Sequence, residues 1–264
     1  MTRRRADVLL AERGLFESRE RAKAAIIAGQ VRIGDRVVFK AGEQLAEDTE
    51  FQISEVDRFV SRGGTKLSGA LDSFGIDPTG MRAIDVGAST GGFTDCLLQR
   101  GAVSVAAVDV GYGQLAWQLR QDPRVTTFER TNIRSADPAE LGAPFDIAVV
   151  DVSFIGLSKI LPQLIDLLNE NGLLVALVKP QFEAGKGRVG KKGVVRDAST
   201  HIDVLETVVS QVRAEGLFVH GLAWSPITGP EGNIEFWLWA KSFGPGATID
   251  PTAVVHAARE SLGV

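Results

Sequence analysis

Apolar positions in the first sixty residues follow short helical and strand periods. Residues 6–14 (ADVLLAERG) and 18–29 (SRERAKAAIIAG) each place their apolar side chains on one face, which predicts two short helices. Gly14 predicts the end of the first helix, because glycine adopts the left-handed conformation without penalty. Residues 31–42 then predict two short strands joined by a tight turn, and residues 50–56 predict another strand. This order of elements indicates a small α+β module.

Apolar runs alternate with amphipathic helices from residue 81 onward. Strands are expected at 82–86, 104–110, 125–132, 146–151, 173–179, 217–224 and 234–241, and helices at 157–168 and 200–215. Pro162 predicts either a bend in the first of these helices or a later start. Continuous apolar runs are typical of parallel strands that are covered on both faces. The pattern therefore predicts an open, Rossmann-like α/β sheet with helices on both faces.

Length and composition are those of an ordinary globular chain. Its 264 residues suffice for about two domains of roughly 150 residues each. No apolar run approaches the roughly 20 residues needed to cross a bilayer, and the N-terminal segment mixes charges into its apolar stretch, unlike a secretory signal. The single cysteine, Cys96, excludes an intrachain disulfide, and no Cys/His group has the spacing of zinc ligands. We therefore expect a cytoplasmic protein with neither a metal ion nor a membrane partner.

Basic residues gather in two segments despite a net charge of −4. Residues 1–40 carry ten Lys and Arg against five Asp and Glu, and residues 179–197 carry six against two. Patches of one sign bind polyanions locally whatever the net charge, so RNA binding is one hypothesis and a solvated charged face is the other. The candidate phosphate contacts are Arg3, Arg4, Arg5, Arg19 and Lys23 in the first segment, and Lys186, Arg188, Lys191 and Lys192 in the second.

A glycine-rich turn, AIDVGASTGGFT at residues 83–94, follows a predicted strand and begins a predicted helix. It lacks the lysine of a P-loop, and its G-x-x-x-G-G spacing differs from the dinucleotide fingerprint G-x-G-x-x-G. We therefore interpret it as the glycine loop of an S-adenosylmethionine site, and a purely structural turn is the alternative. The residues expected to contact that cofactor are Gly87, Ala88, Ser89, Gly91, Gly92, Phe93 and Thr94.

Two polar residues after the next strands fit a nucleoside ligand. Asp109 ends the strand that follows the glycine turn, 22 residues beyond Gly87. A carboxylate there can accept hydrogen bonds from both ribose hydroxyls. Asn132, at the end of the strand expected at 125–132, is placed to reach the edge of an adenine. The register of strand, turn, helix, strand and acid favours a ligand site.

Asp151 and Lys179 each end an apolar strand. Ligands of an open α/β sheet bind outside the carboxyl ends of the strands, so both side chains should face one crevice. Partial desolvation beside the apolar strand favours a neutral lysine amine, which can act as a base. Asp151 could orient that amine or lie near the sulfonium cation of the methyl donor. The alternatives are a surface lysine and a helix-capping aspartate.

Several longer motifs together resemble one protein family. They are SRGGTKL at 61–67, GASTGGFT at 87–94, DVGYGQLAW at 109–117, LVKPQFE at 177–183 and GNIEFWLW at 232–239. With them the chain resembles, over residues 3–241, the TlyA family of ribosomal RNA 2′-O-methyltransferases, some of which carry the name haemolysin. The resemblance implies an RNA-binding domain like that of small-subunit ribosomal protein four at 1–60 and an FtsJ-type class I methyltransferase domain at 68–264. The order of the elements itself predicts the joint near DRFVSRGGTKL (57–67), so we expect a linker at 61–67.

Members of that family use a Lys-Asp-Lys-Glu tetrad, which falls here on Lys66, Asp151, Lys179 and Glu235. The resemblance implies methyl transfer from S-adenosylmethionine to the 2′-oxygen of a cytidine in the ribosomal RNA of one or both ribosomal subunits. Our hypothesis is that Lys179 takes or directs the hydroxyl proton, that Asp151 orients Lys179, and that Lys66 and Glu235 position the ribose. The alternatives are a ribosome-binding or assembly factor without methyl transfer, a small-molecule methyltransferase and a membrane-active haemolysin.

Overall fold

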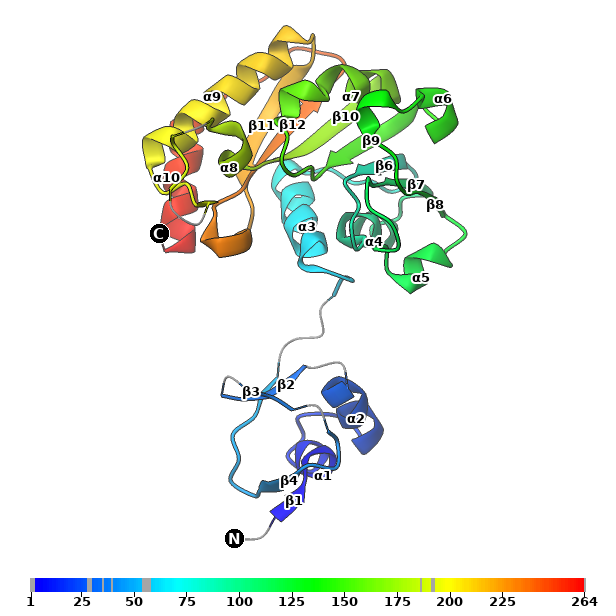
Figure 1. Cartoon of the computed structure of the whole chain (residues 1–264), viewed down its shortest axis with the longest axis vertical. Helices are drawn as coiled ribbons and strands as arrows, with labels where there is room; N and C mark the ends of the chain where they lie inside the picture. Colours follow the sequence, from blue (N-terminus) through cyan, green and yellow to red (C-terminus); the bar gives the residue numbers. More distant parts are fainter. Residues whose placement is uncertain are drawn as a thin grey trace. The chain divides into compact units, whose positions relative to one another are not determined.

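The computed structural model describes residues 3–27, 30–34, 36–38, 40–53, 58–185, 187–190 and 193–263. The chain divides into two compact units, Met1–Arg58 and Phe59–Val264 (Figure 1). This division lies two residues before the boundary expected at residue 60. Each unit folds around an apolar interior of its own residues.

The first unit joins two packed helices to two small antiparallel sheets. The helices are α1 (Ala6–Glu12) and α2 (Arg19–Ile27), and the strands are β1 (Arg3–Arg5), β2 (Val31–Ile33), β3 (Arg36–Val37), β4 (Gln44–Ala46) and β5 (Gln52–Ile53). β1 pairs with β4, and β2 pairs with both β3 and β5. Both helices and the strands β2, β3 and β5 confirm the sequence prediction. β1 and β4 lie outside the predicted strands.

A seven-stranded sheet forms the centre of the second unit, in the order β11-β12-β10-β9-β6-β7-β8. The strands are β6 (Arg82–Val86), β7 (Ser104–Val108), β8 (Val125–Phe128), β9 (Phe145–Val150), β10 (Leu168–Val178), β11 (Phe218–Trp224) and β12 (Phe236–Lys241). The neighbours from β10 to β8 are parallel, and β12 runs antiparallel to both β10 and β11. Each of these strands overlaps a predicted one, but β10 begins at Leu168, five residues before the strand expected at 173–179.

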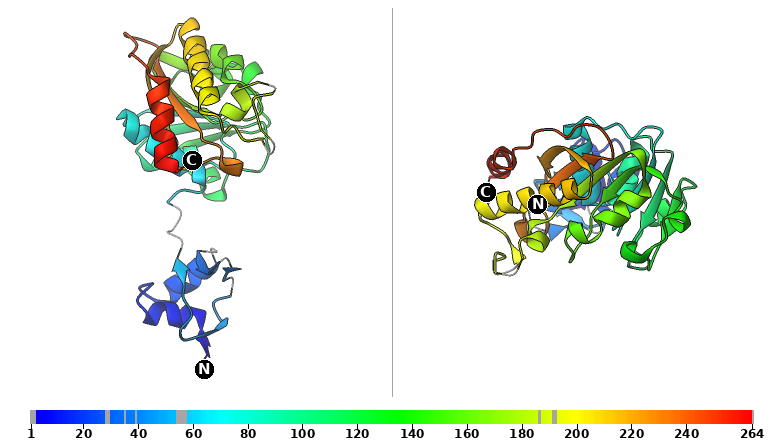
Figure 2. Two further views of the ribbon diagram at one scale, coloured as in Figure 1. Left: turned by 90° about the vertical axis from the view of Figure 1, so that its left-hand side faces the viewer. Right: turned by 90° about the horizontal axis from the view of Figure 1, so that it is seen from above.

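Helices cover both faces of this sheet (Figures 1 and 2). The α-helices are α3 (Arg62–Phe74), α4 (Gly92–Gln99), α5 (Trp117–Arg120), α6 (Pro138–Leu141), α7 (Leu161–Leu167), α8 (Pro180–Glu183), α9 (Ala198–Ala214) and α10 (Pro251–Leu262). Short 3₁₀ turns with described bounds are η1 (Ile133–Ser135), η2 (Leu157–Lys159) and η4 (Pro230–Gly232). Residues of α3 and α4 share one core with the sheet, and residues of α7, α9 and α10 share the other. The predicted α/β fold with helices on both faces is confirmed.

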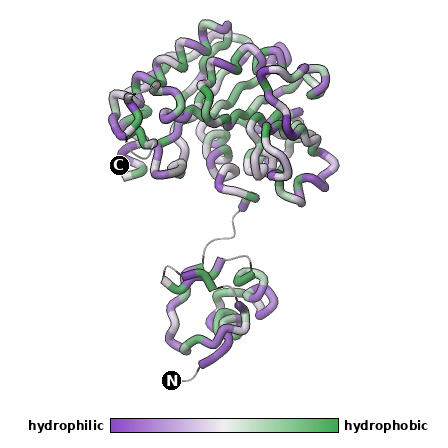
Figure 3. Tube along the Cα trace, viewed as in Figure 1, coloured by the Kyte–Doolittle hydropathy of each residue, from purple (hydrophilic) through white to green (hydrophobic). Residues whose placement is uncertain are grey.

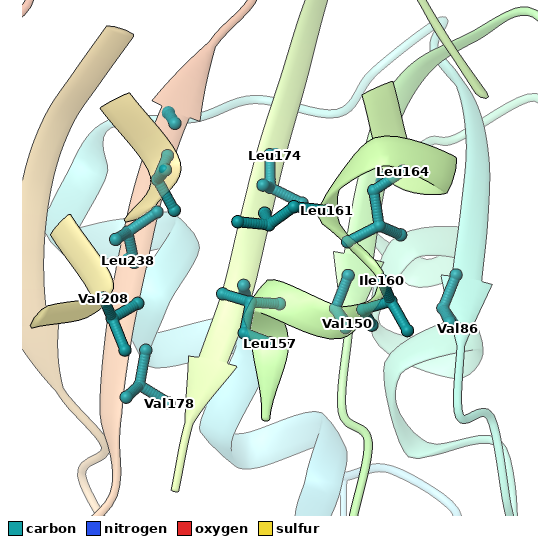
Figure 4. Close-up of a cluster of buried hydrophobic side chains, with 14 of the residues drawn as sticks. Val86, Val150, Leu157, Ile160, Leu161, Leu164, Leu174, Val178, Val208 and Leu238 are labelled. Carbon is teal, nitrogen blue, oxygen red and sulfur yellow. The ribbon is translucent and has the colours of Figure 1, made fainter. Parts of the chain in front are cut away.

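The side chains of a central strand alternate between the two cores. Ile147 and Val149 of β9 belong to the core beneath α3 and α4, whereas Ala148 and Val150 belong to the core beneath α7 and α9. Figure 4 shows Val150 and Leu157 in this second core. Figure 3, coloured by hydropathy, shows hydrophobic residues along the strands of the sheet. Because both faces of β9 are covered, every position of its centre is apolar, which explains the continuous runs in the sequence.

Local residues set the ends of two predicted helices. Pro162 lies in the first turn of α7, directly after η2, where a missing backbone N–H costs no helical hydrogen bond. This is the later start that the proline predicts. Gly216 follows α9 with φ of +87°, the left-handed conformation that ends a helix.

The linker expected at 61–67 is wrong. Helix α3 begins at Arg62, and Lys66 within it is buried, so this segment is part of the second unit. Gly64 explains the packing, because a Cβ at this position would overlap the ring of Phe59. Gly64 is therefore a close-packing residue of the second unit.

Among the helices of the described ranges, none is long and apolar enough to cross a membrane. The same ranges contain no group of three or more His, Cys, Asp or Glu side chains that could hold a metal ion. The last helix, α10, occupies a segment for which the sequence predicts no element, and it packs beside α9.

Candidate active site

The carboxyl ends of four neighbouring parallel strands place the predicted site residues along one edge of the sheet. Gly87 follows β6, Asp109 follows β7, Asp151 follows β9 and Lys179 follows β10. Parallel neighbours direct their carboxyl ends to the same side. The loops after these strands therefore border one region.

Gly87 and Gly91 give the glycine turn its shape. Their φ angles are +89° and +97°, which favour glycine. A Cβ on Gly87 would overlap the carbonyl oxygen of Asp151, and a Cβ on Gly91 would overlap the side chain of Leu119. The turn thus lies directly against the segment that follows β9.

Two adjoining cavities lie beside this turn. The larger, of about 350 Å³, is lined by the turn, by Asp109 and Asn132 and by the segment 151–155. The smaller, of about 220 Å³, is lined by the turn, by Lys66 and by Asp151. Because Asp151 lines both cavities, a ligand in one and a ligand in the other would meet at this carboxylate.

Five of the seven turn residues expected to contact a cofactor line these cavities: Gly87, Ala88, Ser89, Gly92 and Phe93. Gly91 and Thr94 line neither. Thr94 is fully buried, and its backbone N–H and its hydroxyl donate to Oδ2 of Asp85 at 2.9 and 2.7 Å. Both residues therefore shape the turn from within the protein.

Asp85, at the end of β6, is a polar residue that the sequence prediction missed, although it stands inside the glycine motif. Its burial raises the pKa of the carboxyl from 3.8 to about 7; the hydrogen bonds from Thr94 oppose this rise and the charge of Asp151 adds to it. Its Oδ1 is buried and has no hydrogen-bond partner among the described residues. The Asp85 carboxyl group therefore titrates close to neutral pH.

Asp109 and Asn132 are held in place by backbone groups. Oδ2 of Asp109 accepts the Ser89 N–H at 2.8 Å, and Oδ1 accepts the Gly111 N–H at 2.6 Å. Each carboxylate oxygen keeps a second lone pair for a ligand hydroxyl. The amide oxygen of Asn132 accepts the Arg134 N–H at 3.1 Å, so its amide nitrogen is the group that can donate to a ligand.

The four residues of the expected tetrad form two ion pairs. Nζ of Lys66, on α3, donates to Oε2 of Glu235, which precedes β12, at 2.5 Å; the two side chains are 10% and 0% exposed. Lys179 pairs with Asp151, and its Nζ also donates to Oγ of Ser153 at 3.0 Å. Lys66 and Asp151 line the same smaller cavity. The two ion pairs therefore meet at that cavity, beside the glycine turn.

Ser153 is a further residue that the sequence prediction missed, and its signal was its place two residues beyond Asp151 at a strand end. Glu183 is another, although it stands in the motif LVKPQFE. Oε1 of Glu183 accepts the backbone N–H of Leu157 at 2.7 Å, and burial raises the pKa of its carboxyl. The partners of both residues do not show in the sequence, since each lies on another loop.

Three of the arginines expected to bind RNA form ion pairs within the first unit. Arg5 and Arg19 both bind Asp7, at 2.9 and 3.3 Å, and Arg4 binds Glu12 at 2.6 Å. The hydrogen bonds from Arg5 hold the pKa of the buried Asp7 carboxyl below its ordinary value. These arginines therefore also hold the module together.

The other candidate RNA contacts differ in how they are placed. Arg3 and Lys23 are exposed on the first unit. Arg188, in the second unit, donates to Asp203 at 2.7 Å and to the carbonyl oxygen of Ala184 at 3.0 Å. Lys186, Lys191 and Lys192 lie outside the described residues.

Comparison with known proteins gives the same domain order. The FtsJ-like methyltransferase family matches residues 59–242, and the S4 domain family matches residues 4–50. A putative rRNA methyltransferase, YqxC of Bacillus subtilis, is 53% identical over 97% of this chain and 93% of its own. The 16S/23S rRNA (cytidine-2′-O)-methyltransferase TlyA of Mycobacterium tuberculosis is 45% identical over 91% of this chain and 90% of its own.

Solved structures agree with this assignment. A putative hemolysin from Streptococcus thermophilus has 44% sequence identity and a TM-score of 0.77, covering 100% of this chain and 98% of the other. The resemblance read from the motifs is thereby confirmed. The chain belongs, with the TlyA proteins, to the FtsJ-like methyltransferase family, and it carries an S4 domain ahead of its methyltransferase domain.

Proposed function

We propose that the protein transfers a methyl group from S-adenosylmethionine to the 2′-oxygen of a cytidine in ribosomal RNA. Residues 59–264 would carry out the transfer and residues 1–58 would bind the RNA. The observation that carries this proposal is the meeting of the Lys66–Glu235 and Lys179–Asp151 ion pairs at a cavity beside the glycine turn. The similarity to rRNA cytidine-2′-O-methyltransferases supports the choice of substrate.

The larger cavity fits the methyl donor. Asp109 has lone pairs for the two ribose hydroxyls, and Asn132 has an amide N–H₂ for the adenine edge. The glycine at position 87 lets the turn lie against the Asp151 carbonyl, which a Cβ there would overlap. S-adenosylmethionine supplies a methyl group that is already activated by its sulfonium charge. Asp151, on the wall shared by both cavities, offers a carboxylate to that charge.

We assign the removal of the ribose hydroxyl proton to Lys179. A lysine ammonium has three N–H donors, and Asp151 and Ser153 take two of its directions. In the neutral amine, the lone pair then occupies the third direction and can accept the proton of a ribose hydroxyl. Such general base catalysis contributes typically about 10²- to 10⁴-fold to a rate.

Lys66 and Glu235 would position the ribose. Lys66 borders the smaller cavity and carries the donors, while Glu235 holds its Nζ from the buried side. Holding the hydroxyl in line with the methyl group lowers the entropic part of the barrier. The Lys179–Asp151 pair therefore serves proton removal, and the Lys66–Glu235 pair serves orientation of the ribose.

RNA binding is assigned to the S4 domain, with Arg3 and Lys23 as its exposed candidates for phosphate contacts and Arg188 as a candidate on the methyltransferase domain. Phosphate contacts supply affinity and register but not sequence selectivity. Selection of the nucleotide then falls to the methyltransferase domain.

The test is transfer of labelled methyl groups to purified ribosomal subunits from cells that lack the gene, followed by mass spectrometry of the nucleosides. We expect 2′-O-methylcytidine with the wild-type protein, and a loss of about 10²-fold or more with K179A, at unchanged donor affinity. K159A changes an exposed lysine of the same domain and serves as the matched control. No methylated nucleoside with either subunit would overturn the proposal in favour of a ribosome-binding factor.

A further inference from the structure

The segment between β9 and η2 is tied to the strand end of β10 at two points. At its beginning, Asp151 and Ser153 hold the amine of Lys179. At its end, the backbone N–H of Leu157 donates to Oε1 of Glu183 at 2.7 Å. Lys179 directly precedes α8, and Glu183 is the last residue of that helix. The segment and the helix are therefore joined on either side of the catalytic amine.

Glu183 faces the segment with both carboxylate oxygens. Oε1 binds Leu157, and a Cβ on Gly156 would lie 3.0 Å from Oε2. Glu183 is half-buried, so this contact is only partly open to competing water. The Leu157 side chain is anchored in the core with Val150, as Figure 4 shows. The Glu183 carboxylate thus fixes the backbone N–H of Leu157, and the core fixes the side chain of the same residue.

The segment holds a backbone conformation that needs such support. Phe154 has φ of +67°, in the left-handed region that residues other than glycine rarely adopt. Its ring lies 5.2 Å from that of Phe182, on α8. Strained backbone of this kind persists where its surroundings hold it in place. Because Phe154 directly follows Ser153, a change in its backbone would move the hydroxyl that binds Lys179.

We infer that Glu183 is a positioning residue for Lys179, acting through the segment 153–157. This inference rests on the proposed function. Glu183 accepts the Leu157 N–H and holds the segment, the segment holds the Ser153 hydroxyl, and that hydroxyl sets the direction of the amine. Loss of the carboxylate frees the segment, so the lone pair of Lys179 no longer points toward the substrate.

The test compares E183A and E183Q in the full-length protein. E183A removes the acceptor, whereas E183Q keeps an amide oxygen that can accept the same N–H. We expect kcat for subunit methylation to fall by about 100-fold in E183A, the loss that a misplacement of about 1 Å can cause. E183Q should retain kcat within about tenfold, with KM for the subunit and donor Kd unchanged in both. E206A, at an exposed glutamate of α9, is the matched control.

A double variant tests the route of the effect. If Glu183 acts through Ser153, the loss in E183A/S153A should be smaller than the product of the two single losses, since both remove the same constraint. Independent, multiplying losses would overturn the route. G156A provides a second perturbation if E183A does not fold, because the added methyl presses on Oε2; it should lower kcat in the same way.

An unchanged kcat in E183A would overturn the inference, as would equal losses in E183A and E183Q or a lower Tm with normal kcat. All these measurements require a wild-type protein that methylates ribosomal subunits. Absence of that activity would refute the proposed function. If the wild-type protein is active and E183A has the same kcat, only the inference is refuted.

Discussion

Breaking the buried Lys66–Glu235 pair should destabilise the methyltransferase unit by several kilocalories per mole. The Glu235 side chain is 0% exposed and that of Lys66 is 10% exposed. Removal of one partner leaves the other charge buried without its counter-ion, which costs about 3–5 kcal/mol. We therefore expect K66M and E235L each to lower the free energy of unfolding of this unit by that amount.

Urea unfolding followed by tryptophan fluorescence measures this loss. All four tryptophans, Trp117, Trp224, Trp237 and Trp239, belong to the second unit, so their signal reports on that unit alone. D203N removes a partner from the exposed Arg188–Asp203 pair, whose side chains are 46% and 55% exposed. This control should cost no more than about 1 kcal/mol.

The double variant K66M/E235L separates stability from catalysis. Apolar side chains of similar volume in place of a buried ion pair are often neutral for stability or better, so most of the lost unfolding free energy should return. Methyl transfer should not return, because the donors that position the ribose are gone. A single-variant loss below about 1 kcal/mol would refute the reasoning, since it would equal that of an exposed pair.

Three further predictions concern the donor site and the RNA-binding unit. Folding raises the pKa of Asp85 from 3.8 to about 7, so the contribution of this carboxyl to stability is present below about pH 4 and is lost as the pH rises through 7. The asparagine of D85N does not titrate. In urea titrations D85N should therefore become more stable relative to the wild type as the pH rises from about 4 to 8. G87A should weaken donor binding at least about tenfold in calorimetry, since its Cβ overlaps the Asp151 carbonyl. G216A, with a similar positive φ but open space, should leave donor binding unchanged. R3A/K23A should lower the salt dependence of RNA binding by about one unit of slope for each phosphate that the variant no longer neutralises, and an unchanged slope would remove both residues from the interface.

The order and type of the main elements can be read from the amino-acid pattern alone. Strands such as β9 are buried on both faces, so their apolar runs are continuous, and α9 is one-sided, so its period is helical. The glycine turn and Asp109 were also readable, because turn geometry and the position after a strand are local properties. Asp151 and Lys179 were readable in the same way, and the resemblance to a family then added Lys66 and Glu235 to complete the tetrad.

Which of these residues touch depends on the packing of the folded chain. Lys66 and Glu235 stand 169 positions apart, and their hydrogen bond exists because α3 and β12 pack together. The same holds for the Glu183–Leu157 bond and for the helical state of residues 62–67, where we expected a linker. A local pattern of apolar residues predicts which side chains are buried. It does not predict which residues from distant segments bury them, since that depends on how all the elements pack at once.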